Sequence, residues 1–334
     1  MIVRVYGIEI SRALIGGAIG LTLIAAIACG SGGDEADVAP TSVPDAGAAV
    51  AESTRPTLTN TDDFTQRNEE NGLITILATT DLGVGNGRFA FVLTEPGGLV
   101  KFPVVGVKSF FYPDGYEGER DGPIDDQFAI FREFPFGTRG VYTADYNFDR
   151  AGEWGVEVSL PTSDGSFLTT EHRFEVNAVT TAPSVGQRPP DATNRTLSDV
   201  ESIKELTTGS LRDPELYDLS IPDALESGRP FAVVFASPAF CTTAVCGPQV
   251  EVLSELNETY GDRMDFIHVD LFINPHEIQG DLDLAVHTPL LMEWGLFTDE
   301  WTFVMDSTGA VAGRFEGFSP YSEIEETILR ALEG

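Results

Sequence analysis

The chain has 334 residues, with 53 acidic side chains against 20 basic ones and a formal net charge of −33 at pH 7. This balance excludes the basic surface that nucleic-acid binding needs, and it disfavours direct adsorption to anionic lipid headgroups. A hydrophobic content of 42% leaves room for two folded domains in addition to a leader and a linker.

Residues 1–28 have the layout of an export signal. Two arginines flank a short basic region, and an apolar run over residues 13–28 is shorter than the roughly 20 residues of a membrane-spanning helix. The run ends at Ala-Ile-Ala-Cys, which resembles the lipobox of bacterial lipoproteins. The resemblance implies lipidation of Cys29, which would anchor the mature chain to the cell membrane on its extracytoplasmic side. An ordinary signal peptide or an uncleaved anchor remains the alternative.

Residues 29–71 are rich in small, acidic and polar residues and poor in large apolar ones. Such a segment buries too little surface to offset its ordering entropy. We therefore expect a flexible acidic linker that holds the folded part away from the membrane.

Residues 72–178 predict an all-β domain. Short runs of β-branched and aromatic residues alternate with Gly, Pro, Asn and Asp turns, which is the spacing of a two-sheet sandwich. The stretch 140–158 resembles the closing hairpin of immunoglobulin-like exported domains of the YtkA-like and CopC-like families. In it, Tyr142 and Trp154 are expected as core anchors. A CopC-like copper site is not expected, because His172 is the only histidine of the region.

A Pro-rich joint over residues 179–195 follows. Its part Val-Gly-Gln-Arg-Pro-Pro-Asp, at 185–191, resembles the entry of redoxin and TlpA-like domains. The joint should separate the two domains.

Residues 196–334 alternate between apolar strand-like runs and amphipathic segments, which predicts an α/β sandwich. The expected strands and helices are 222–227 (helix), 231–236 (strand), 248–260 (helix), 265–272 (strand), 289–295 (helical turn), 301–306 (strand), 310–317 (strand) and 322–332 (helix). This order resembles the thioredoxin fold, most closely its redoxin or TlpA-like branch.

Cys241 and Cys246 lie in the loop that links the strand 231–236 to the helix 248–260. Cys246-Gly-Pro resembles the start of the thioredoxin Cys-Gly-Pro-Cys motif, but Gln249 stands in place of the second cysteine. The resemblance implies catalytic roles for both thiols, with Cys246 attacking and Cys241 resolving. A helix N-terminus stabilises a thiolate, and an exported cysteine pair is oxidised by default.

Trp301 occupies the position at which thioredoxin-like proteins carry a cis-proline before a strand. The resemblance therefore implies a substrate-binding role for Trp301. A cis bond before a residue other than proline costs about 2.5–4 kcal/mol, so a trans bond is expected here.

Membrane-anchored thiol–disulfide exchange with a protein thiol or disulfide partner, and without a cofactor, is the leading functional hypothesis. The main alternative is a binding or scaffold lipoprotein whose disulfide is structural. A Sco-like copper carrier would bind copper through the loop cysteine pair and a distant histidine. Of His268, His276 and His287, the last is the best third ligand. A peroxiredoxin is suggested by Pro-Ala-Phe-Cys-Thr-Thr at 238–243. Three acids, Asp262, Asp265 and Asp270, are expected as exposed or turn residues.

Overall fold

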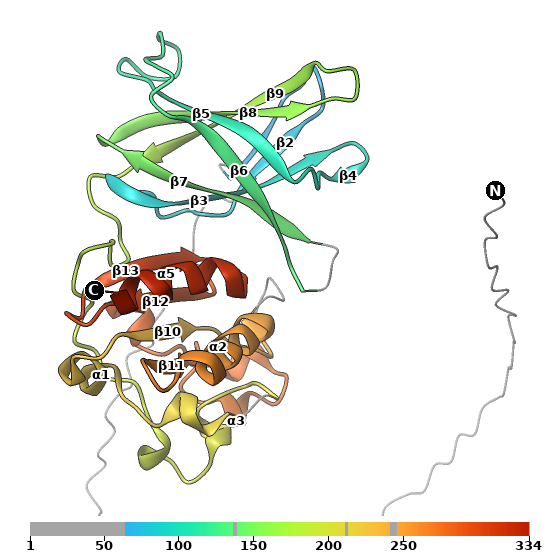
Figure 1. The fold of residues 1–334 in the computed structure, drawn as a ribbon. Coiled ribbons are helices and arrows are strands. Elements are labelled where there is room, and N and C mark those ends of the chain that lie inside the picture. Colours follow the sequence, from blue (N-terminus) through green and yellow to red (C-terminus); the bar gives the residue numbers. More distant parts are fainter. Residues whose placement is uncertain (1–63, 136–138, 211–212, 241–245, 334) are drawn as a thin grey trace, which may run out of the picture. The chain divides into compact units, whose positions relative to one another are not determined.

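The computed structural model describes residues 64–135, 139–210, 213–240 and 246–333. All of them belong to one compact unit, Ala51–Gly334, which contains two β-sheets (Figure 1). The predicted signal peptide 1–28 and the lipidation residue Cys29 lie outside the described residues. Among the described residues, no helix has both the length and the apolarity to cross a bilayer.

The larger sheet contains nine antiparallel strands within the described residues, in the order β1-β2-β3-β7-β6-β5-β8-β9, with β4 paired to β3. Its strands are β1 (Thr65–Arg67), β2 (Ile74–Leu77), β3 (Gly85–Glu95), β4 (Gly98–Leu99), β5 (Val104–Phe111), β6 (Asp126–Glu133), β7 (Gly140–Phe148), β8 (Gly152–Pro161) and β9 (Phe167–Val176). Strand β1 begins before residue 72, within the predicted linker. Its three residues, Thr-Gln-Arg, are polar and carry no alternating apolar signal.

The two edges of this sheet approach one another. The amide side chain of Gln66 donates to the carbonyl oxygen of Arg173 at 2.6 Å and accepts from its N–H at 2.9 Å. Asn68 and Asn71 both donate to the carbonyl oxygen of Thr169. The sheet is therefore nearly a closed barrel, and the immunoglobulin-like sandwich of two sheets is not confirmed. Strand spacing alone does not distinguish these arrangements, because it does not say which edges meet.

Aromatic residues fill the interior of the large sheet, as the sequence predicts. Tyr142 and Trp154 are fully buried. The Tyr142 hydroxyl donates to the carbonyl oxygen of Phe102 at 2.8 Å, and the Trp154 indole N–H donates to that of Arg150 at 3.1 Å. Each ring thus buries its apolar body while its polar atom keeps a partner.

The smaller sheet has the order β11-β10-β12-β13, in which β10 and β11 are parallel and the other pairs antiparallel. Its strands are β10 (Phe231–Phe235), β11 (Asp265–Val269), β12 (Trp301–Met305) and β13 (Val311–Glu316). The α-helices are α1 (Ile221–Ser227), α2 (Cys246–Tyr260), α3 (Pro275–Ile278), α4 (Leu290–Glu293) and α5 (Tyr321–Glu333). Short 3₁₀ helices are η2 (Leu197–Asp199), η3 (Ile203–Glu205), η4 (Pro214–Tyr217) and η5 (Leu282–Leu284).

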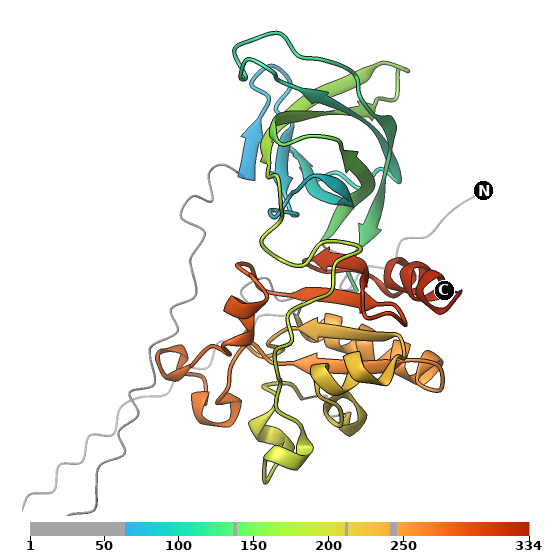
Figure 2. The ribbon, with the colours of Figure 1, turned by 90° about the vertical axis from the view of Figure 1, so that its left-hand side faces the viewer.

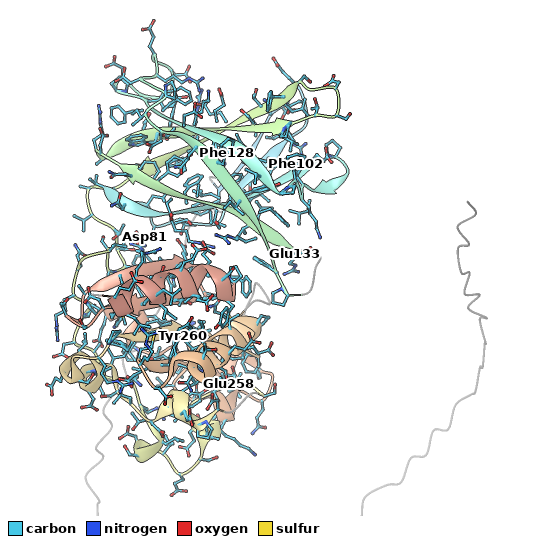
Figure 3. The ribbon with its side chains drawn as sticks, in the orientation of Figure 1. Asp81, Phe102, Phe128, Glu133, Glu258 and Tyr260 are labelled. Atoms are coloured by element: carbon cyan, nitrogen blue, oxygen red, sulfur yellow. The ribbon has the colours of Figure 1, made fainter. Side chains whose placement is uncertain are left out.

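Helices lie on both sides of the smaller sheet (Figure 2). Each face of the sheet has its own hydrophobic core. Val234 of β10 packs with Leu253 of α2 and Ile328 of α5 on one face. On the opposite face, Val233 and Phe235 of β10, which are two residues apart, pack in one core with Ile221 of α1. The alternation follows from the strand period of two residues. The predicted α/β layering is confirmed. The two helices on the α2 face also contact one another: the hydroxyl of Tyr260, labelled in Figure 3, donates to Glu325 of α5 at 2.6 Å.

Buried ion pairs join the two sheets. Arg314 of β13 donates to Asp81 at 2.7 Å, and the two side chains are each 9% exposed; Asp81 is labelled beside β13 in Figure 3. Arg88 of β3 donates to Glu323 of α5 at 2.8 Å. The carboxylate of Glu316 accepts from the N–H and the hydroxyl of Thr80 at 2.6 and 2.5 Å. The two sheets therefore share buried polar contacts rather than only a flexible connection.

Candidate functional site

Cys246 is the first residue of helix α2, it is fully buried, and it is disulfide-bonded. The other two cysteines of the chain, Cys29 and Cys241, lie outside the described residues, so the Cys241–Cys246 pairing stays a prediction. The position agrees with the strand-loop-helix pattern of the sequence: β10 ends at Phe235, and α2 begins at Cys246. A helix N-terminus carries partial positive charge, which stabilises a thiolate when the disulfide opens.

A hydrogen-bonded network around the buried side chain of Asp270 holds the chain that leads into the cysteine loop. The carboxylate of Asp270 accepts from the N–H and the hydroxyl of Thr208 at 2.7 and 2.9 Å. The Thr208 hydroxyl lies 3.0 Å from the hydroxyl of Ser237 and accepts from the N–H of Ala239. Burial raises the pKa of Asp270 to about 6, against the opposing effect of these hydrogen bonds. The expectation of an exposed or turn acid is therefore wrong for Asp270, which is 4% exposed.

His268 does not offer a free nitrogen to copper. Its Nδ1 lies 2.7 Å from the hydroxyl of Tyr217, and its Nε2 lies 3.0 Å from the carbonyl oxygen of Ala236. Because a carbonyl oxygen only accepts, Nε2 carries the proton and Nδ1 accepts from Tyr217. Burial lowers the pKa of His268 to about 4, so the ring is neutral.

The remaining histidines of the copper alternative have other neighbours. His276 lies near Glu277, and His287 packs its ring 5.0 Å from that of Phe272. Among the described residues, no group of three or more His, Cys, Asp or Glu side chains could hold a metal ion.

Trp301 begins β12, opposite Phe235, and its side chain is 1% exposed. The ring stacks on Phe303, and its N–H donates to the hydroxyl of Thr298 at 3.0 Å. Trp301 belongs to the hydrophobic core on the α1 face of the sheet, whereas Cys246 belongs to the core on the α2 face. Trp301 therefore packs on the face of the sheet opposite to the core that contains Cys246, and its ring presents almost no surface to a substrate.

Glu300, immediately before β12, is a residue that sequence reasoning missed. It is fully buried, neither carboxylate oxygen has a hydrogen-bond partner, and its backbone φ is 69°. Burial raises its pKa well above the ordinary value, while the charge of Arg88 lowers it and that of Asp299 raises it further. No periodicity or motif marks Glu300, since its neighbours Asp299 and Trp301 look like the end of a surface loop and the start of a strand.

Three further buried polar atoms without partners occur in the same part of the fold: the Nε2 of Gln249 and the hydroxyls of Thr302 and Ser319. Gln249 lies three residues after Cys246 on α2, and its side-chain oxygen accepts from the N–H of Ser319 at 2.9 Å. We call Gln249, Glu300, Thr302 and Ser319 the polar cluster. It lies between the first turn of α2, the start of β12 and the segment before α5.

The segment before α5 also contacts the large sheet. Phe134, which follows β6, packs edge-to-face on Phe318 with ring centroids 4.7 Å apart. The guanidinium of Arg88 donates to the carbonyl oxygens of Glu316 and Phe318 at 2.9 and 3.1 Å. Both contacts lie in the hydrophobic core that contains Cys246 or at its edge. The large sheet thus contacts a segment whose Phe318 belongs to the same hydrophobic core as Cys246.

Comparison with known proteins gives solved structures at low similarity. No family model matches the chain, and a search of curated proteins finds no match. A thiol:disulfide interchange protein of the thioredoxin family from Chlorobium tepidum TLS is similar with a TM-score of 0.31 and 14% identity, over 45% of this chain and 99% of that one. The apo form of Trgpx is similar with a TM-score of 0.24 and 16% identity, over 38% of this chain and 96% of that one.

Proposed function

We propose that the chain is a membrane-anchored, extracytoplasmic thioredoxin-like protein that exchanges disulfides with a protein partner through Cys241 and Cys246. The observation that carries the proposal is the disulfide-bonded Cys246 at the N-terminal end of a helix that follows a central strand. One sulfur of the disulfide therefore lies at the end of a helix that stabilises a thiolate. The proposed anchor is the lipid on Cys29.

The burial of Cys246 decides the proposed order of events. A substrate cannot reach a sulfur atom with no exposed surface, so the first attack is assigned to Cys241 and the resolving role to Cys246. These roles are the reverse of those that the thioredoxin motif implies. The thiolate of Cys241 attacks a substrate disulfide, one substrate sulfur leaves as a thiolate and takes a proton, and a mixed disulfide forms.

The second step closes the cycle. Cys246, as a thiolate, attacks the Cys241 sulfur, the second substrate sulfur leaves and takes a proton, and the Cys241–Cys246 disulfide is restored. Two electrons pass from the protein thiols to the substrate disulfide. In the reverse direction, the protein disulfide oxidises a dithiol substrate by the same intermediates.

Trapping of the mixed disulfide tests this assignment. Full-length Cys246→Ser protein should accumulate a covalent adduct with a disulfide-bonded model peptide, because the second step is blocked. Cys241→Ser protein should not form the adduct while it is folded. A Cys29→Ser variant serves as the matched control for the remaining thiol. Adduct formation by neither single variant would contradict exchange chemistry.

A structural disulfide in a binding or scaffold protein is the second candidate, and the complete burial of Cys246 favours it. The reduction potential separates the two functions. A value below about −300 mV would place the pair among structural disulfides that thiol pools do not reduce, whereas a higher value supports exchange.

A further inference from the structure

The outer face of the large sheet carries four exposed apolar side chains on or beside two neighbouring strands. Phe128 and Ile130 lie on β6, Val104 begins β5, and Phe102 comes two residues before β5. Phe128 is 71% exposed, and the other three are between 37% and 46% exposed. We call these four residues the β5–β6 patch; Phe102 and Phe128 are labelled in Figure 3. Because soluble monomers seldom expose large apolar side chains in a group, the patch indicates a surface that another molecule covers.

The strand register brings these side chains together. Val104 pairs with Ile130, and Gly106 pairs with Phe128. Ala129, between Phe128 and Ile130, is fully buried in the interior of the large sheet. Since side chains alternate along a strand, Phe128 and Ile130 point to the outside. The patch is therefore continuous across the two strands.

Gly106 leaves a gap in this surface beside Phe128. It lies between Phe128 of β6 and Ser159 of β8, and it pairs with both. A Cβ atom at this position would lie 3.5 Å from the Cβ of Ser159, which is an ordinary van der Waals contact. Crowding within the chain therefore does not require a glycine here. One use of a glycine in a strand is the close approach of a ligand or another chain.

The charge around the patch differs from that of the whole chain. Residues 101–108 and 126–133 carry three basic side chains and two acidic ones: Lys101, Lys108, Arg132, Asp126 and Glu133. The whole chain carries 20 basic and 53 acidic side chains. The two stretches that form the patch thus lack the excess of negative charge with which two copies of this chain otherwise repel each other.

Exposed ion pairs flank the patch at both ends. Lys108 lies 3.3 Å from Asp126 at one end of the paired strands, and Lys101 lies 2.9 Å from Glu133 at the other. An exposed ion pair contributes little by itself, so each lysine can exchange its carboxylate for one on another molecule at little cost. A surface with both signs of charge at both ends is complementary to a copy of itself.

We propose that the β5–β6 patch is the interface of a two-fold symmetric dimer of this chain. In this dimer the two sheet faces pack together, and the Phe128 ring of each copy covers Gly106 of the other. The lysines at the ends of one patch meet the carboxylates at the ends of the other. A two-fold axis requires a surface that is complementary to itself in shape and charge, and the ring beside the gap and the mixed ion pairs meet this requirement. The inference depends neither on disulfide exchange nor on the lipid anchor.

Sedimentation equilibrium of the full-length chain over a range of concentrations tests the proposal. The wild type should reach twice the chain mass of 36.0 kDa and should stop there. Phe128→Ser should raise the dissociation constant by about a hundredfold, because an aromatic anchor contributes about tenfold and is lost twice in a symmetric dimer. A wild type that stays monomeric, as it would if residues 1–63 of the same chain covered the patch, overturns the proposal. A mass that rises without limit also overturns it.

Two single variants assign the association to the patch. Gly106→Val fills the gap without crowding the chain, so it should unfold at the wild-type urea concentration and yet weaken the dimer. Leu282→Ser removes an apolar side chain that is 53% exposed in the small-sheet part of the chain, and it should dimerise like the wild type. Association through the apolar run 13–28 would persist in Phe128→Ser and Gly106→Val, and that result would contradict the assignment.

Charge reversal tests whether the second molecule is another copy. Lys101→Glu/Lys108→Glu makes the ends of the patch acidic, and Asp126→Lys/Glu133→Lys makes them basic. Each double variant should be monomeric alone, because like charges then meet across the two-fold axis. An equimolar mixture should restore a dimer with one copy of each variant, and added salt should weaken it. Folded variants that stay monomeric when mixed would contradict the pairing of the two patches.

Discussion

Arg88 and Glu323 are 235 positions apart in the sequence, yet their side chains share two hydrogen bonds of 2.8 and 3.2 Å. Their exposed fractions are 6% and 9%. The pair connects β3 of the large sheet to α5 of the small one. The guanidinium of Arg88 therefore connects the two sheets, and its charge also lowers the pKa of Glu300.

Removal of Arg88 should destabilise the protein strongly. Arg88→Met leaves the Glu323 carboxylate buried without its partner, which costs about 3–5 kcal/mol in the free energy of unfolding. Urea denaturation measures this loss. Lys101→Met is the matched control, because the Lys101–Glu133 pair has side chains 40% and 54% exposed; it should cost no more than about 1 kcal/mol. Equal losses for the two variants would contradict a buried clamp.

Asp270 should make stability depend on pH. Its pKa is raised to about 6 in the folded state, so the folded protein binds more protons than the unfolded chain between about pH 4 and 6. The stabilising contribution is present below the unfolded pKa and is lost as the pH rises through 6. The unfolding free energy of wild type, relative to Asp270→Asn, should fall by about 3 kcal/mol over this range. A difference that stays constant from pH 4 to 7 would show that Asp270 is not perturbed.

Trp301 should support the fold rather than the substrate. Trp301→Ala removes a buried ring and should cost about 3–5 kcal/mol. Trp301→Phe keeps most of the volume, so the folded variant should exchange disulfides with a model peptide at the wild-type rate. A rate that falls several-fold in Trp301→Phe, with stability little changed, would restore the substrate-binding role that the sequence predicts.

Tyr217 should stabilise the protein through His268. Tyr217→Phe leaves the buried Nδ1 of His268 without a donor and should cost about 1–3 kcal/mol in unfolding free energy. Tyr321→Phe is the control, since the Tyr321 hydroxyl makes an exposed hydrogen bond to Thr259; its effect should stay within about 0.5 kcal/mol. If the two variants unfold at the same urea concentration, the Tyr217–His268 bond carries no net stability.

Much of the small sheet could be predicted because its signals are local. The apolar run at β10, the Gly-Pro that follows Cys246 and the periodic pattern of α2 each lie within a few residues of one another. Strand and helix periods expose such patterns directly. The same reasoning placed Cys246 beside the start of the helix, but it did not predict that Cys246 is buried.

The large sheet was predictable only as a series of strands. Its turns and alternating residues indicate how many strands form, but the approach of Gln66 to Arg173, 107 positions away, depends on how the sheet curls. A sandwich and a near-barrel share the same strand pattern and differ in which edges meet.

The sequence by itself thus determined the strand-loop-helix unit that carries Cys246, because the periodic pattern of apolar residues that predicts a strand or a helix lies within a short stretch of chain. Only the tertiary structure decided that Trp301 and Cys246 belong to opposite faces of one sheet, and that Asp270 and Glu300 are buried. The physical reason is that burial and charge pairing depend on residues far apart in the chain. The sequence around an acidic residue in a loop does not show whether its carboxyl group is exposed to water or lies near the guanidinium of a distant strand.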